Sequence, residues 1–158
     1  MKKLGILHAG FLAVMFLLPS TSFCAGRNTG IGVILGEPTG FSTKVWLNDS
    51  MAIDGAVAWS FVGDPDLHLH GDVIWHNWQV LDDAFEVDDS AKFPLYYGIG
   101  GRLKTGGEAT AGIRFVIGGS YVFQYSPFDI FIEIVPIMDF APETELSFNA
   151  ATGFRFWF

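Results

Sequence analysis

The last fourteen residues, 145–158, alternate between two kinds of side chain. Even positions are mostly apolar and end in three aromatic residues, Phe154, Phe156 and Phe158, whereas odd positions other than Trp157 are polar, charged or small. Successive side chains of a β-strand point to opposite faces, so this alternation predicts a strand with one apolar face. An aromatic face that ends on a terminal phenylalanine favours contact with lipid over contact with water. We therefore interpret this segment as the closing strand of an outer-membrane β-barrel.

The composition of the chain fits a barrel better than a bundle of membrane helices. Of the 158 residues, 50% are hydrophobic, only 16% are charged and 19 are glycine. A transmembrane helix needs about 20 consecutive apolar residues, but beyond residue 25 glycine or polar residues interrupt every apolar run. Short alternating segments rich in glycine and aromatic residues are what a transmembrane barrel requires. The length allows one domain.

Residues 1–25 have the features of a secretory signal peptide. Lys2 and Lys3 precede a mostly apolar stretch that ends at Pro19, which is the usual order of a charged and then an apolar region. We predict that this segment is cleaved and that residues 26–158 form the barrel domain. Lipid attachment at Cys24 is an alternative, although Phe23 stands where a lipoprotein signal has a small residue.

Seven further alternating segments precede the closing strand. We expect strands at 30–36, 41–48, 51–62, 67–78, 93–104, 108–123 and 128–140. Glycine and proline mark most of the short turns between them, and Gly118-Gly119 is expected to mark a bulge or kink inside a strand. Eight is an even number, as in bacterial single-chain barrels. The sequence predicts an all-β, eight-stranded antiparallel up-and-down transmembrane β-barrel preceded by a cleaved signal peptide.

The connection at 79–92 is the longest and is rich in Asp and Glu. If the closing strand ends in the periplasm, the strand order places this connection on the periplasmic side. The short turns at 36–40, 63–66, 105–107 and 141–144 are then external. Outer-membrane barrels usually have short periplasmic turns and long external loops, so the expected placement is atypical. A periplasmic protein is the partner we expect for 79–92.

Charged and histidine side chains recur on the faces predicted to point inward. The main members of this set are Lys44, Asp54, His68, His70, Asp72, Arg102, Arg114, Glu133 and Arg155. An eight-stranded barrel has an interior just wide enough for side chains, and buried charges need partners. We predict a polar network that fills the lumen, with Arg155 paired to Asp54, Asp72 or Glu133. A gated ion path is the alternative interpretation.

One cluster within this set suggests chemistry. His68, His70, Asp72 and His76 lie on one face of the strand at 67–78. Imidazole and carboxylate groups bind zinc, but residues two apart on a strand are about 7 Å apart, so only neighbours could share an ion. Ser60 could instead combine with His68 or His70 and an acid as a hydrolytic triad, although no nucleophile motif surrounds it. We therefore predict no catalytic residues, no bound metal and no cofactor.

The plan of the chain, with a signal peptide, alternating strands and Phe158 at the end, resembles the small OmpA/OmpX-type eight-stranded outer-membrane barrels. Residues 36–40, residues 94–102 and the last strand are similar to an uncharacterised group of bacterial outer-membrane barrel proteins. The resemblance implies contact with outer-membrane lipid and lipopolysaccharide. It also implies recognition of the strand ending in Phe158 by the barrel-assembly machinery.

The function predicted from these features is a non-enzymatic structural or interaction barrel in the bacterial outer membrane. The alternative is an outer-membrane hydrolase that modifies lipid or lipopolysaccharide with the Ser60/His68/His70 region. A soluble β-barrel that binds an apolar ligand is a third interpretation. A net charge of −8 without a basic face excludes a nucleic-acid partner.

Overall fold

The computed structural model describes residues 27–60, 66–80, 91–106 and 109–158. The strands are β1 (Thr29–Gly36), β2 (Thr39–Trp46), β3 (Met51–Ser60), β4 (Asp66–Asn77), β5 (Ala91–Lys92), β6 (Leu95–Thr105), β7 (Thr110–Phe123), β8 (Phe128–Ala141) and β9 (Glu145–Trp157). The predicted signal peptide, the expected strand end at Val62 and most of the connection 79–92 lie outside the described residues. Within the described part, no helix is long and apolar enough to cross a membrane.

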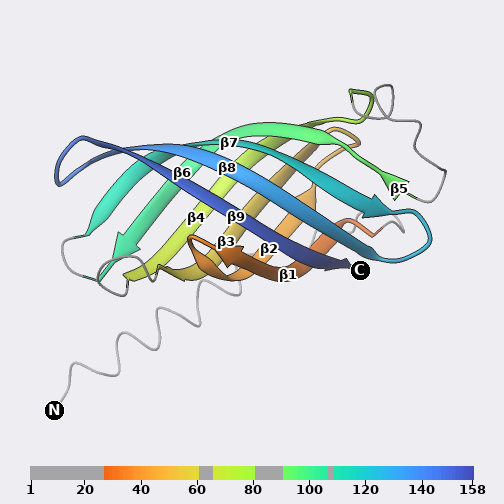
Figure 1. Ribbon diagram of the computed structural model, residues 1–158, viewed down its shortest axis with the longest axis horizontal. Helices are drawn as coiled ribbons and strands as arrows, with labels where there is room; N and C mark the ends of the chain where they lie inside the picture. The colour runs from red at the N-terminus through yellow and green to blue at the C-terminus, as the bar shows by residue number, and fades with distance from the viewer. Residues whose placement is uncertain (1–26, 61–65, 81–90, 107–108) are drawn as a thin grey trace, which may run out of the picture.

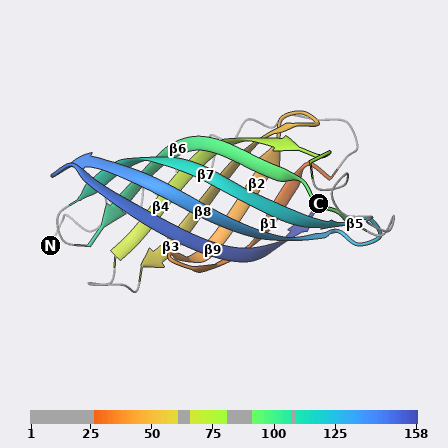
Figure 2. The ribbon, with the colours of Figure 1, turned by 45° about the horizontal axis from the view of Figure 1, so that its top comes forward.

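The strands form a closed antiparallel barrel, seen from two sides in Figures 1 and 2. Each long strand pairs with the next, and β9 closes the ring by pairing with β1, where Ile31 lies opposite Phe156. The short strand β5 is a continuation of β6 and does not count as a ninth strand of the barrel. Both strands pair with β7 in the same register, Lys92 with Val122 and Leu95 with Gly119. The predicted all-β, eight-stranded up-and-down barrel is therefore confirmed.

The register fixes how steeply the strands are tilted. Starting at Gly32, the paired residues around the barrel are Ser42, Ala56, His70, Arg102, Gly112, Asp139 and Glu145. This path around the barrel reaches β9 at Glu145, but across the closing seam Gly32 pairs directly with Arg155. The two positions on β9 differ by ten residues, which is the stagger of the barrel. A stagger of this size tilts eight strands by roughly 40° from the barrel axis. Side chains far apart in the sequence are thereby brought to one level of the interior.

Alternation along each strand separates an apolar outer surface from a filled interior. In β8, the isoleucines 130, 132 and 134 are exposed, while Asp129, Phe131, Glu133 and Val135 are buried. Two apolar clusters also occupy the interior: Ala52, Ile74, Tyr96, Val116, Val135 and Ile137 form one, and Ile34, Ala56, Ala58, Phe131 and Ala151 form the other. The buried polar side chains lie between and around these clusters.

The first hairpin is tighter than the predicted turn at 36–40. Strand β2 begins at Thr39 instead of Phe41, so only Glu37 and Pro38 separate the two strands. The Thr39 hydroxyl donates to the carbonyl oxygen of Gly36 (2.9 Å) and accepts from its N–H (3.1 Å), which closes the turn with one side chain. Gly36 has a φ of 130°, a conformation that glycine tolerates best.

The prediction of a bulge at Gly118-Gly119 is wrong. The β7–β8 pairing runs without a shift through these glycines, and the irregularity lies between Ala111 and Gly112 instead. A Cβ atom at Gly118 would come within 2.5 Å of the Tyr96 ring. Glycine is therefore required there because a large side chain from β6 fills the adjacent space.

Two adjacent glycines of β6 provide a matched test of the inward and outward faces. A Cβ atom at Gly100 would lie 2.1 Å from both Asp72 Oδ1 and the Gly71 carbonyl oxygen, whereas at Gly101 the nearest atom is 3.7 Å away. We expect Gly100→Ala to lower the free energy of unfolding by about 1–3 kcal/mol through overpacking, and Gly101→Ala to change it by less than about 0.5 kcal/mol. Urea unfolding in lipid vesicles, followed by tryptophan fluorescence, measures both. Equal effects would contradict the assignment of faces.

Candidate functional site

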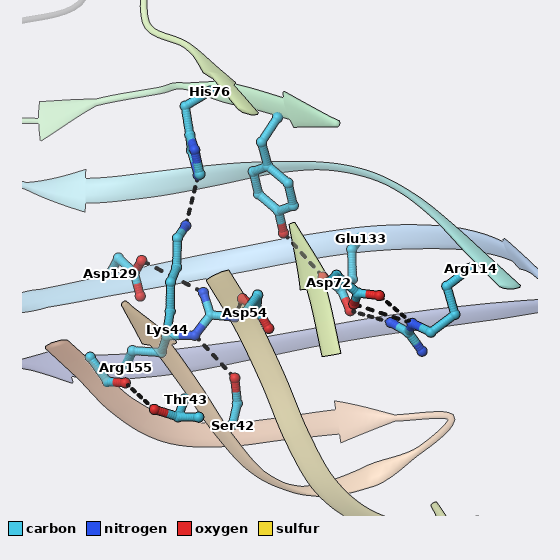
Figure 3. A network of polar contacts seen from close by, with 12 residues as sticks. Ser42, Thr43, Lys44, Asp54, Asp72, His76, Arg114, Asp129, Glu133 and Arg155 are labelled. Atoms are coloured by element: carbon cyan, nitrogen blue, oxygen red, sulfur yellow. Dashed lines mark hydrogen bonds and ion pairs between the residues drawn. The ribbon is translucent and has the colours of Figure 1, made fainter. Parts of the chain in front are cut away.

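The interior of the barrel holds the residues that the sequence suggested as functional. The nine predicted residues, Lys44, Asp54, His68, His70, Asp72, Arg102, Arg114, Glu133 and Arg155, are all buried there, and Figure 3 shows part of the network. They come from seven strands, because inward positions of neighbouring strands meet across so narrow a barrel. Four ion-paired or hydrogen-bonded groups can be distinguished.

Arg155 of β9 is the centre of the first group. Its Nη2 donates to Asp54 Oδ2 of β3 (2.5 Å), and its Nε donates to the hydroxyl of Ser42 (3.1 Å). Nη1 lies 3.9 Å from Asp129 Oδ2, and the guanidinium stacks on the Phe131 ring with Cζ 3.8 Å from the ring centre. The sequence predicted Asp54, Asp72 or Glu133 as the partner of Arg155, and the structure pairs it with Asp54.

Arg114 of β7 organises the second group. Its Nε lies 3.1 and 3.2 Å from the two carboxylate oxygens of Asp72 on β4. Its Nη2 is 3.8 Å from Glu133 Oε1 of β8, and Tyr96 donates its hydroxyl to the other oxygen of Glu133 (3.3 Å). Arg114 therefore links β4 and β8, which are separated in the wall by β6 and β7.

Arg102 of β6 forms the third group with Asp139 of β8. The two side chains make a two-point ion pair through Nε and Nη2. The same Nη2 also donates to the hydroxyl of Ser147 on β9 (2.9 Å). Two parallel N–H···O bonds fix the orientation of both side chains, which a single contact would not do.

Lys44 forms the fourth group with aromatic residues. Its Nζ lies 2.7 Å from His76 Nε2, as Figure 3 shows, and 4.9 and 5.2 Å from the ring centres of Trp46 and Tyr96. An ammonium group near the faces of such rings is stabilised by cation–π attraction. Lys44 is thus held by an imidazole and two rings, without a direct carboxylate contact among the described residues.

The interior charges nearly balance. Four buried cations, Lys44, Arg102, Arg114 and Arg155, face five buried acids, Asp54, Asp72, Asp129, Glu133 and Asp139, in the part of the chain that the structure describes. Sequence reasoning missed Asp129, although it has the same parity in β8 as Glu133 and the alternation there could have identified it. Buried charges persist only where partners compensate them, and each of the three buried arginines has at least one buried carboxylate within 4 Å.

The structure describes the surroundings of His68 and His70, the histidines considered as metal ligands or catalytic bases. His68 and His70 contact each other, with ring centres 5.4 Å apart, and lie opposite Ala58 and Ala56 of β3. Nε2 of His68 and Nδ1 of His70 have no hydrogen-bond partner within the described residues. Ser60 pairs with Asp66 in the β3–β4 ladder, four residues beyond the partner of His70.

No group of three or more metal-binding side chains occurs in the described ranges. A triad also requires its base within hydrogen-bonding distance of both nucleophile and acid. The absence of bound metal and of catalytic residues stays a prediction, since the Ser60 side chain lies outside the described part of the structure.

A pocket of about 740 Å³ opens at the barrel end that holds both described termini. Trp46, Trp78, Trp157 and Lys92 are among its lining residues, and Lys44 and Asp129 lie at its inner wall. Trp78 and Lys92 flank the long acidic connection, so this connection begins and ends at the same barrel end as Phe158. His76, the partner of Lys44, also lines this pocket.

Comparison with known proteins relates the fold to one solved structure. The chain is similar to the crystal structure of the N-terminal β-barrel domain of Pseudomonas aeruginosa OprF, with a TM-score of 0.61, 12% sequence identity and coverage of 84% of this chain and 98% of that one. No protein-family model and no curated protein sequence matches the chain. At this identity the similarity establishes a shared barrel fold.

Proposed function

We propose that this protein is an integral outer-membrane barrel with a sealed interior and a structural or interaction role. The observation that carries the proposal is the set of ion pairs that cross the interior. Arg155 reaches from β9 to Asp54 on β3, and Arg114 reaches from β7 to Asp72 on β4. Each of these four side chains is less than a tenth exposed. Paired side chains that span the interior would block a continuous water path for ions or substrates.

The outer surface supports placement in a membrane. Exposed apolar residues occur on every long strand of the barrel, from Phe128 and Phe158 at one end to Phe140 and Leu146 at the other. A soluble protein rarely exposes so continuous an apolar surface, whereas a transmembrane barrel requires an apolar band about 25 Å tall. The fold shared with the OprF barrel domain supports the same assignment.

Partners follow from this placement. Lipid and lipopolysaccharide would surround the apolar band, and the closing strand that ends in Phe158 would be recognised by the assembly machinery. The connection 79–92 would face the periplasm together with the C-terminus, and an acidic segment there suits a basic surface on a periplasmic protein.

A sealed interior predicts the absence of conductance. We expect the purified protein, inserted into planar lipid bilayers, to produce no discrete current steps. Insertion is verified separately by the shift in gel migration on heating that folded barrels display. Regular current steps from folded protein would overturn the sealed-interior proposal.

Thiol labelling provides a second measurement of the same property. In a chain with Cys24 replaced by serine, Ser42→Cys places a thiol in the interior, where Ser42 is 2% exposed, and Asn48→Cys places one on an exposed turn. We expect a charged methanethiosulfonate reagent to modify position 42 at least ~100-fold more slowly than position 48. Similar rates would mean that water and ions pass the network.

A further inference from the structure

The wall of the barrel is lower at the first hairpin than elsewhere. Strands β1 and β2 each have 8 residues, whereas β7, β8 and β9 have 14, 14 and 13. Figure 1 shows the orange β1–β2 hairpin ending well short of the blue β8–β9 hairpin at that end of the barrel. A membrane-crossing strand needs about 9–11 residues, so β1 and β2 are too short to span the apolar band.

Among the described residues, one edge of β9 has no neighbouring strand beyond the first hairpin. The pairing of β1 with β9 ends at Gly36 and Ala151, and next to it the Glu37 N–H donates to the Ala150 carbonyl oxygen (3.1 Å). Beyond it, no strand within the described ranges pairs with residues 145–149 on the β1 side. β8 pairs with the other side of β9 as far as Glu145.

The direction of the backbone groups identifies which residues are affected. Even residues of β9 direct their N–H and C=O groups toward β1, as the bonds at Ala150 and Phe158 establish, and odd residues such as Trp157 direct theirs toward β8. Because the direction alternates along a strand, the N–H and C=O groups of Leu146 and Phe148 point into the gap above the first hairpin. The open edge therefore consists of two donors and two acceptors.

This edge lies within the apolar band. Leu146 and Phe148 are 61% and 67% exposed on the outer face, and Met138 and Phe140 on the adjacent strand are also exposed. Polar residues begin only at the turn from Pro142 to Glu145. Lipid chains offer no hydrogen-bond partners, and open sheet edges do not persist in hydrocarbon unless protein covers them.

We propose that the edge of β9 at Leu146 and Phe148 is a docking site for an extended strand of a different membrane polypeptide. The proposal rests on the membrane placement proposed above. A strand supplies the alternating donors and acceptors that the edge lacks, and apolar outward side chains on it would continue the surface of Leu146 and Phe148. Among the described residues, β1 and β2 end below this level, so no neighbouring strand occupies the β1 side of Leu146 and Phe148.

A second copy of this chain does not fit the same gap. At this end of the barrel, the edge that the described residues of a second copy offer is the same edge of β9, since β5, which also pairs on one side only, lies at the opposite end beside Trp157. Two barrels inserted in the same direction would present these edges with their strands crossing at roughly 80°, twice the tilt of one strand. Strands crossed in this way cannot form a hydrogen-bonded ladder, so the partner must be a different polypeptide.

Amide hydrogen exchange in three preparations tests the proposal. The protein is compared in detergent micelles, in vesicles of purified outer-membrane lipid and in native outer-membrane vesicles. We expect residues 145–149 to exchange at least ~10-fold more slowly in native membranes than in the other two preparations. Equal protection in purified lipid would mean that lipid covers the edge, and rapid exchange in all three would mean that water does; either result overturns the proposal.

Residues 130–134 of β8 serve as the internal control, because strands pair with both of its edges there. Their protection in every preparation reports an intact inserted barrel, and its loss in native membranes would contradict the proposed membrane placement rather than the docking site. A photocrosslinking residue in place of Leu146 should form one discrete adduct in native membranes, and one in place of Ile132 should form none. An adduct of twice the chain's mass would identify a second copy and overturn the proposal.

The variant Phe148→Lys places a charge beside the edge, where charges oppose strand addition, and Phe148→Leu keeps the surface apolar. We expect the lysine variant to lose the native-membrane protection of residues 145–149 and the leucine variant to keep it, with residues 130–134 protected in both. Unchanged protection in the lysine variant would contradict strand docking.

Discussion

Replacing Arg155 by methionine is expected to lower the free energy of unfolding by about 3–5 kcal/mol, the cost of leaving a buried charge without its partner. Arg155 is 1% exposed and faces Asp54 and Asp129 from opposite sides of its guanidinium. Methionine keeps much of the side-chain volume, so the loss measures charge compensation more than cavity formation. Urea unfolding in lipid vesicles, followed by tryptophan fluorescence, provides the measurement.

The companion variants separate charge from packing. Adding Asp54→Asn to Arg155→Met removes one uncompensated carboxylate and should restore about half of the lost stability, because an uncharged amide costs less to bury than a carboxylate. Arg27→Met, at an exposed position, should change stability by less than about 0.5 kcal/mol. If Arg155→Met behaved like Arg27→Met, the buried charges would not form one interdependent network.

The architecture could be predicted from the sequence because side-chain alternation is local. The odd positions of β8 illustrate this: Asp129, Glu133 and Asp139 are all buried, although Pro136 interrupts the strand. Proline at this position removes a donor on the β7 side, and the recorded β7–β8 pairs omit Phe115 and Val116 there. The alternation continues regardless, since it depends on extended backbone and not on each ladder bond.

The partners within the interior could not be predicted in the same way. Arg102 and Asp139 are 37 residues apart in the sequence, and their contact depends on the registers of β6–β7 and β7–β8, which place both residues level with Gly112 of the strand between them. The irregularity between Ala111 and Gly112 helps to set this register, and a different register at either pairing would give Arg102 a different partner. Alternation alone leaves this register open, because a shift by two residues preserves the faces.

The alternation of side chains also did not predict where each strand begins and ends. Phe93 and Pro94 divide one strand into β5 and β6, and the Pro94 carbonyl still accepts from the Ser120 N–H (3.0 Å). The alternation predicted that this strand starts at Phe93, whereas pairing with β7 extends it back to Ala91. Tertiary pairing therefore decided the boundary that local residue preferences placed elsewhere.

Replacing Ile134 by arginine is expected to reveal whether the outer surface contacts lipid. Ile134 is 58% exposed and lies midway along β8, where it is paired with Ala150. On a water-facing surface the substitution would change the free energy of unfolding by less than about 0.5 kcal/mol. In the middle of the apolar band it should cost about 2–4 kcal/mol, because the guanidinium would enter hydrocarbon.

The matched substitution Phe128→Arg lies at the end of the same strand, next to the turn at 124–127, and should cost about 0–1 kcal/mol because the side chain reaches the interface. Both variants are compared with the unmodified protein by urea unfolding in vesicles of a single lipid. A large penalty at position 134 and a small one at 128 would locate the centre and the edge of the apolar band. Small effects at both positions would instead favour a barrel surrounded by water, and the membrane placement would have to be abandoned together with the docking site that rests on it.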